Sequence, residues 1–162
     1  MKWLLLVYKI PSQPSKLRLQ VWRKLQRLGA VYLQDAVCVL PDEPELEENF
    51  HYLAQSIQEM GGQSFVFRTE SLSPQTQEQV LAGFRSQADE RLAEISRRLS
   101  QVDLADDPER AEECLKNERV AFLRANRLNY FGSNRANIVE TQLEQLKNAL
   151  NHANQPQPRR NS

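Results

Sequence analysis

The chain opens with a run of apolar residues over 3–10 that is interrupted by Lys9 and stopped by Pro11. A short apolar run that ends at a proline is typical of a β-strand covered on at least one face, because proline cannot donate to a strand ladder. The run is too short to cross a membrane, and no small-residue cleavage site follows it. It therefore predicts a central strand. We expect no secretory signal, no membrane contact and a cytoplasmic location.

Helical and strand patterns then alternate along the chain. Apolar spacing by threes and fours predicts helices over 16–28 and 43–60, with Ser15 as the N-cap and Gly29 at the C-cap of the first. The other predicted strands cover 30–33, 36–40 and 64–68. The order βαββαβ predicts an α+β fold, in which a ferredoxin-like unit over residues 1–70 places two helices on one face of an antiparallel sheet.

Past residue 74 the apolar residues keep helical spacing, which predicts an all-helical extension over 75–150. Asp107 followed by Pro108 marks a break and the start of a new helix, with Asp107 as its N-cap. The apolar stripes need partners, so we expect either a helical hairpin or small bundle within the chain, or coiled-coil pairing with a second chain. Residues 151–162, rich in Asn, Gln, Pro and Arg, are predicted to form a disordered tail.

No set of catalytic or metal-ligating residues stands out in the sequence. His51 lies within a predicted helix and His152 within the predicted tail, and neither has the spacing of a metal-ligand set. Cys38 and Cys114 are far apart and are expected to be buried, reduced thiols. We therefore expect a protein that is not an enzyme, with no catalytic residue, no cofactor and no bound metal.

The net charge of zero conceals an uneven distribution. Residues 1–40 contain seven Lys or Arg and one Asp, whereas residues 41–69 contain one Arg and six acidic residues. The candidate nucleic-acid-binding residues are the cations that lie off the apolar stripe of the first predicted helix: Lys16, Arg18, Arg23, Lys24 and Arg27. Such a surface can neutralise phosphates. The alternative is a solvated helix face that pairs with the acidic second helix. Trp22 falls inside the stripe and is predicted to be a core residue rather than a base-stacking one.

Several segments resemble one known family. They are WLLLVYKIP at 3–11, PSKLR at 14–18, VWRKL at 21–25, LGAV at 28–31, VLP at 39–41, GG at 61–62 and YFG at 130–132. Together they resemble the amino-terminal domain of the chromate-resistance regulator ChrB. The resemblance implies a role in a chromate-resistance operon, as a regulator of the adjoining efflux gene. It also implies a further carboxy-terminal domain in full-length members, so a separate ChrB C-terminal-type protein is a possible partner.

The same opening resembles, more distantly, the ferredoxin-like domain of phenylacetate-operon repressors and of small CRISPR-adaptation nucleases. In those nucleases the first strand usually ends in a metal-binding Asp, and here Lys9 stands at that position. A cation cannot ligate Mg²⁺, which disfavours nuclease activity. Three hypotheses follow: a transcriptional regulator that binds DNA through its first helix, a non-enzymatic homodimerisation or protein-interaction module, and, more remotely, a metal-dependent nuclease.

Overall fold

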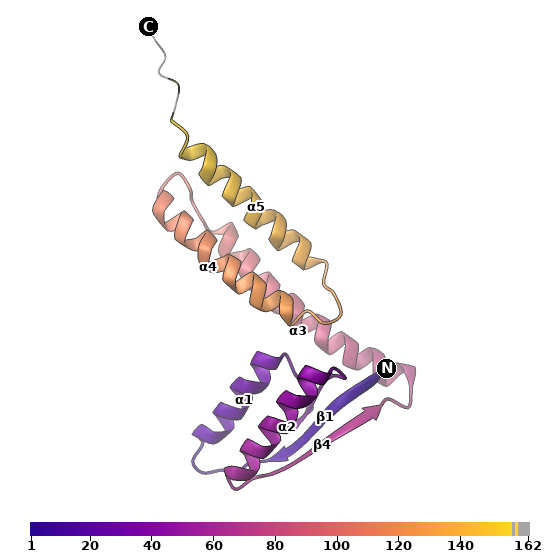
Figure 1. Cartoon of the computed structure of the whole chain (residues 1–162). Coiled ribbons are helices and arrows are strands. Elements are labelled where there is room, and N and C mark those ends of the chain that lie inside the picture. Colours follow the sequence, from indigo (N-terminus) through magenta and orange to yellow (C-terminus); the bar gives the residue numbers. More distant parts are fainter. Residues whose placement is uncertain (157, 159–162) are drawn as a thin grey trace. The chain divides into compact units, whose positions relative to one another are not determined.

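The computed structural model describes residues 1–156 and 158, and the chain packs as two compact units, Met1–Ser86 and the residues from Gln87 onward. The strands are β1 (Lys2–Lys9), β2 (Val31–Gln34), β3 (Val37–Pro41) and β4 (Gln63–Glu70), and the helices are α1 (Lys16–Leu28), α2 (Pro44–Glu59), α3 (Pro74–Ser100), α4 (Pro108–Arg127) and α5 (Arg135–Ala153) (Figure 1). The predicted α+β class is confirmed. The predicted domain limits, 1–70 and 75–150, stay predictions, and the compact units divide inside the continuous helix α3.

The first unit is built around β1, which lies between β3 and β4 in a four-stranded sheet of order β2-β3-β1-β4. Both neighbours run antiparallel to β1. Ser64 pairs with Tyr8 across the sheet, and its hydroxyl donates to the Ala54 carbonyl of α2 at 2.7 Å. Because side chains alternate between the two faces of a strand, the even positions of β1 face the helices. Leu4 and Leu6 are therefore fully buried under α1 and α2, which lie side by side over the sheet (Figure 1).

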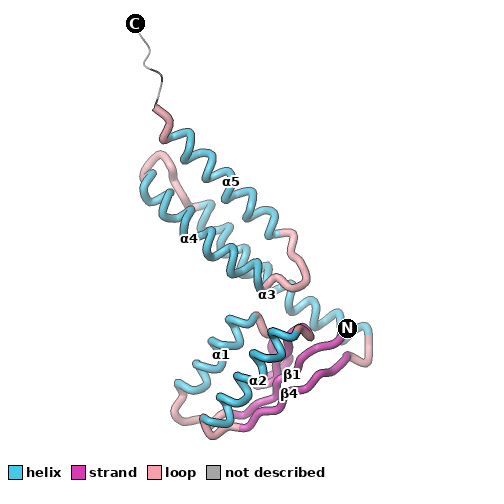
Figure 2. Tube along the Cα trace, in the orientation of Figure 1, coloured by secondary structure: helices cyan, strands magenta, loops and turns pink. Residues whose placement is uncertain are grey.

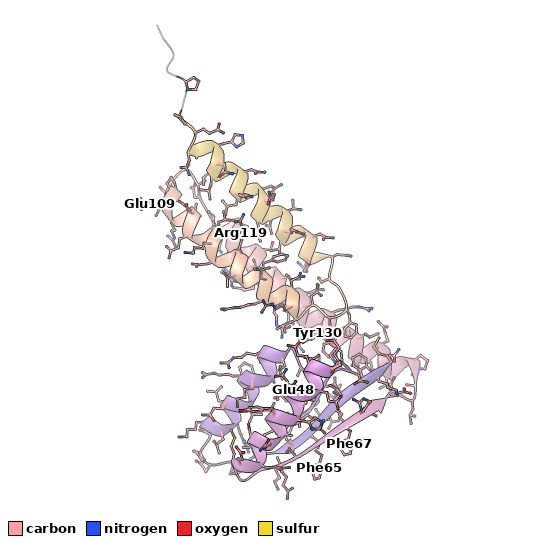
Figure 3. The ribbon with its side chains drawn as sticks, viewed as in Figure 1. Glu48, Phe65, Phe67, Glu109, Arg119 and Tyr130 are labelled. Carbon is pink, nitrogen blue, oxygen red and sulfur yellow. The ribbon has the colours of Figure 1, made fainter. Side chains whose placement is uncertain are left out.

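The opposite face of the sheet is covered in part by the first turns of α3. The Trp3 ring stacks on Phe84 with a centroid separation of 5.7 Å, which buries both side chains. Farther along this face, Phe65 and Phe67 of β4 remain about half exposed (Figure 3). The alternation predicted for β4 thus holds, but both of its phenylalanines lie on the face away from α1 and α2.

The second unit packs the rest of α3 against α4 and α5 (Figure 2). Its core contains Leu92, Ile95, Leu99, Ala111, Leu115, Ala125, Val139, Leu143 and Leu150. The predicted apolar stripes therefore meet within the chain, as a small helical bundle does. Asp107 caps α4 as predicted, because its carboxylate accepts a hydrogen bond from the Arg110 amide at 3.0 Å.

The caps of α1 agree only in part with the sequence prediction. Gly29 adopts the left-handed conformation with φ 72°, and the Ala30 amide donates to the Leu25 carbonyl, as a helix C-cap requires. Ser15 is the N-cap residue as predicted, but its side chain makes no capping hydrogen bond. The Leu17 amide instead donates to the Pro14 carbonyl at 3.2 Å, so the backbone itself forms the first turn.

Two further expectations are corrected. Cys38 is buried as predicted, and its burial raises the pKa of the thiol to about 12, but Cys114 is only half-buried because it lies at the edge of the bundle core. Helix α5 continues through Ala153, so His152 is helical and its ring lies 2.7 Å from the Asn148 carbonyl. The predicted tail, 151–162, therefore begins too early, and part of it (157 and 159–162) lies outside the described residues.

Candidate nucleic-acid interface

Helix α1 turns its basic residues away from the sheet. Val21 and Leu25 are fully buried, while Lys16, Arg18, Arg23 and Arg27 are exposed and Lys24 is half-buried. At about 100° per residue, Lys16, Arg23 and Arg27 lie within roughly 40° of one another around the helix axis. Arg18 and Lys24 lie on the two flanks of the buried stripe. The five predicted residues thus form an outward row of three, with one cation on each side.

The α1 cations make no ion pair among the described residues. Two acidic side chains of the neighbouring segment, Asp42 and Glu47, pair with Arg68 instead. Arg68 of β4 donates to Asp42 at 3.0 Å and to Glu47 of α2, and these contacts raise the pKa of the guanidinium, with the Asp42 hydrogen bond as the main cause. His51 lies 3.7 Å from Glu47 on the exposed side of α2. Pairing of the first helix with the acidic second helix, the alternative interpretation of its charge, is therefore not seen in the described part of the chain.

Trp22 is not a core residue, contrary to the sequence prediction. Its side chain is 49% exposed and lines a groove of about 920 Å³ between α1 and the ends of β1 and β2. The physical reason is its position at the edge of the stripe, about 100° around the axis from Val21. We call this hollow the α1 groove. Its main lining residues are Tyr8, Lys9, Arg18, Trp22, Tyr32 and Asp35.

The α1 groove combines aromatic surface with polar groups. The hydroxyls of Tyr8 and Tyr32 lie 2.8 Å apart and share a hydrogen bond, and burial raises the pKa of both phenols. Both phenols are therefore protonated at neutral pH, and because one hydroxyl donates to the other, one O–H of the pair remains available to a further acceptor. Lys9 and Arg18 line this groove and also a smaller adjoining hollow of about 380 Å³. The sequence did contain one signal for the groove. Arg18 and Trp22 are four residues apart, which places both side chains on one side of α1.

The described residues contain neither a metal-ligand cluster nor a membrane-spanning helix. No cluster of three or more His, Cys, Asp or Glu side chains is arranged to hold a metal ion in the described part of the chain. Among the described helices, none has the length and apolar character needed to span a bilayer.

The region that carries α1 matches a known family. The family described as Protein ChrB, N-terminal, matches residues 18–103, just over half of the chain. The chain belongs to the ChrB N-terminal family. The resemblance noted in the sequence is thus confirmed. Protein ChrB of Cupriavidus metallidurans is 28% identical over 109 residues, which cover 66% of this chain and 34% of that relative. This chain therefore matches about a third of the length of that relative, and no solved structure matches it.

The extent of the ChrB N-terminal match bears on the candidate interface. It begins at Arg18, so it includes Trp22, Arg23, Lys24 and Arg27, and it leaves out Lys16. It ends just after α3, so the YFG segment at 130–132 lies outside it. The part of the chain shared with the ChrB N-terminal family therefore contains most of the basic surface of α1.

Proposed function

We propose that this protein is a non-enzymatic, chromate-resistance-associated regulatory protein that binds DNA through α1. Membership of the ChrB N-terminal family supports the association with chromate resistance. The observation that carries the DNA-binding part is the set of α1 cations without carboxylate partners among the described residues. Lys and Arg side chains that are free of internal partners can displace counterions from phosphates, and the release of those counterions favours binding.

The geometry of α1 favours contacts to the DNA backbone. Lys16, Arg23 and Arg27 project from one side of the helix over nearly its whole length. A row of cations of this kind can follow a phosphate strand, which positions a protein on the duplex without reading base edges. We therefore expect binding that depends strongly on salt and only weakly on sequence.

The first prediction concerns a double variant that lacks two cations of the outward row. We expect Arg23→Ala/Arg27→Ala to weaken binding to duplex DNA by about tenfold and to reduce the salt slope of the binding constant by about two, because each lost phosphate contact removes about one released counterion. Fluorescence-anisotropy titrations of a labelled promoter duplex, repeated at several salt concentrations, measure both quantities.

A matched control removes two arginines that already have partners. Arg85 pairs with Glu78 at 3.1 Å, and Arg97 pairs with Glu94. Arg85→Ala/Arg97→Ala changes the net charge by the same amount, and we expect it to leave the salt slope nearly unchanged. If the two double variants lose affinity equally, or if the unaltered protein does not bind duplex DNA at low salt, α1 is not the interface.

A second candidate function, self-association, is favoured by the outer face of α4. The exposed residues on this face are Glu109, Glu112, Glu113, Lys116, Arg119, Val120, Leu123, Arg124 and Arg127. The acidic members lie in the first turns of the helix and the basic members follow from Lys116 to its end, as the labelled Glu109 and Arg119 indicate (Figure 3). None of these charged side chains forms an ion pair among the described residues.

Such a face is complementary to a second copy of itself. In an antiparallel pair related by a two-fold axis, the acidic first turns of each α4 face the basic last turns of the other. Exposed Val120 and Leu123 near the middle supply apolar surface for the contact. The support for this dimer is charge complementarity, so its stability should fall as salt screens the pairs.

The second prediction uses a charge swap on the outer face of α4. Glu109→Lys/Glu112→Lys leaves Glu113 as the one acidic member of this face, and we expect it to abolish the dimer because mostly like charges then oppose one another. Adding Arg124→Glu/Arg127→Glu restores complementarity and is expected to restore the dimer. Sedimentation equilibrium at low and high salt measures the association constant. A monomer at every concentration tested, or a dimer that the first pair of substitutions leaves intact, would reject this face.

A further inference from the structure

The wall of the α1 groove presents an aromatic surface to solvent. Trp22 is 49% exposed although Val21 beside it and Leu25 in the next turn are fully buried. Tyr8 and Tyr32 form the floor, and both are half-buried. Flat aromatic side chains that border an open groove offer stacking surface to a planar ring, and this preference does not depend on which ring it is.

Two cations and several hydrogen-bonding groups border the same groove. Arg18 and Lys9 are exposed, line the groove and make no ion pair among the described residues. One hydroxyl of the Tyr8–Tyr32 pair can donate to a ligand, and the exposed Asp35 carboxylate can accept from an amino or hydroxyl group. The groove thus offers stacking, anion binding and polar recognition together. Its volume of about 920 Å³ lies within the range of small-molecule sites.

We propose that the α1 groove binds a nucleoside monophosphate, with its base against Trp22 and its phosphate neutralised by Arg18 and Lys9. A nucleotide matches each part of the groove: the base supplies a planar ring, the phosphate supplies the anion, and the sugar and base edges supply partners for Asp35 and the tyrosine hydroxyls. This site is separate from the outward row of α1, because Lys16, Arg23 and Arg27 do not line the groove. The proposal therefore does not require that α1 bind duplex DNA.

The test compares three probes with the full chain in the absence of DNA. Adenosine monophosphate carries both ring and anion, adenosine carries only the ring, and ribose 5-phosphate carries only the anion. We expect adenosine monophosphate to bind about tenfold more tightly than ribose 5-phosphate, because one base stack is worth about that factor. We expect a similar margin over adenosine, which lacks the charge-assisted contacts of the phosphate. Calorimetric titration gives the affinities. Tryptophan fluorescence locates the site, because Trp3 is buried against Phe84 and only Trp22 can contact the ligand.

Two variants separate the contributions within the groove. Trp22→Ala and Arg18→Ala are each expected to weaken binding of adenosine monophosphate by about tenfold. Both side chains are exposed, so the variants should fold, and far-ultraviolet circular dichroism checks this. Arg85→Ala is the matched control, because Arg85 is an exposed arginine outside the groove. We expect it to leave the affinity for the nucleotide unchanged within twofold.

A free nucleotide and a nucleotide within single-stranded DNA present the same ring and phosphate. A deoxyadenosine tetranucleotide distinguishes these two ligands. Equal affinity for the tetranucleotide and the mononucleotide indicates a free nucleotide as the ligand. Much tighter binding of the tetranucleotide that Trp22→Ala abolishes indicates a strand. The proposal is overturned if adenosine monophosphate binds no better than ribose 5-phosphate. It is also overturned if Trp22→Ala and Arg18→Ala both bind adenosine monophosphate as the unaltered protein does.

Discussion

Gly62→Ala is expected to destabilise the first unit by about 3 kcal/mol or more, because the new methyl group would overlap backbone atoms that cannot move independently. A Cβ at this position would lie 2.3 Å from the Lys9 carbonyl oxygen, 2.9 Å from the Ile57 Cγ2 atom and 3.1 Å from the Ile57 carbonyl oxygen. Lys9 pairs with Gln63 at the end of β1, and the Gly62 amide donates to the Ile57 carbonyl at 2.9 Å. The close approach therefore joins β1, α2 and β4.

Urea unfolding followed by tryptophan fluorescence measures this effect, because both tryptophans, Trp3 and Trp22, lie in the first unit. Gly61→Ala is the matched control at the adjacent position. Gly61 has φ +85°, but the nearest atom to a Cβ there would be the Pro11 ring at 3.9 Å, so we expect only the conformational cost of about 1–2 kcal/mol. Equal losses in the two variants would show that the chain relieves the contact at Gly62 by a small shift.

Arg98→Met is expected to lower the free energy of unfolding of the helical bundle by about 2 kcal/mol, below the 3–5 kcal/mol typical of a fully buried pair, because solvent reaches Arg98. The Arg98 guanidinium donates to both carboxylate oxygens of Glu118, at 2.7 and 3.0 Å. The hydrogen bond to Glu118 is the main reason that the pKa of Arg98 is raised. Glu118 is only 7% exposed, so the substitution would leave a charged carboxylate beside the bundle core without its partner.

The reverse substitution supplies the control for this prediction. Glu118→Met removes the buried charge and leaves Arg98 exposed, with Glu94 still 3.3 Å away. We therefore expect Glu118→Met, alone or combined with Arg98→Met, to cost less than Arg98→Met alone. Urea unfolding followed by circular dichroism measures all three variants. Equal losses for the two single variants would mean that the pair contributes as a surface ion pair does, whatever the burial of Glu118.

Local signals in the sequence located most helices and strands within one to a few residues. The two predicted caps with a strong local cause, Gly29 and Asp107, are both present in the structure. Glycine adopts the left-handed conformation at little cost, and an aspartate before a proline can accept from an open helix amide wherever the helix begins. Ser15 is the N-cap residue of α1 but makes no side-chain cap, and the Pro14 carbonyl accepts from the Leu17 amide instead.

The sequence predicted the cations of the candidate site but not its groove. All five basic residues of α1 were identified from their spacing, because charged side chains at helix positions away from the apolar stripe face solvent whatever lies on the other side. Trp22 was assigned to the core by the same periodicity. Its exposure depends on the ends of β1 and β2, which lie beside α1 and leave the indole at the open α1 groove.

By itself, the sequence determined the order of elements, the family and which cations of α1 face away from its apolar stripe, because periodicity, terminating residues and short motifs act over a few neighbouring positions. Only the tertiary structure decided which half-apolar surfaces are covered: Trp22 and Phe67 remain exposed, whereas the charged Glu118 is buried. The physical reason is that burial depends on what packs opposite a side chain. That partner comes from a segment distant along the chain, and no local pattern encodes it.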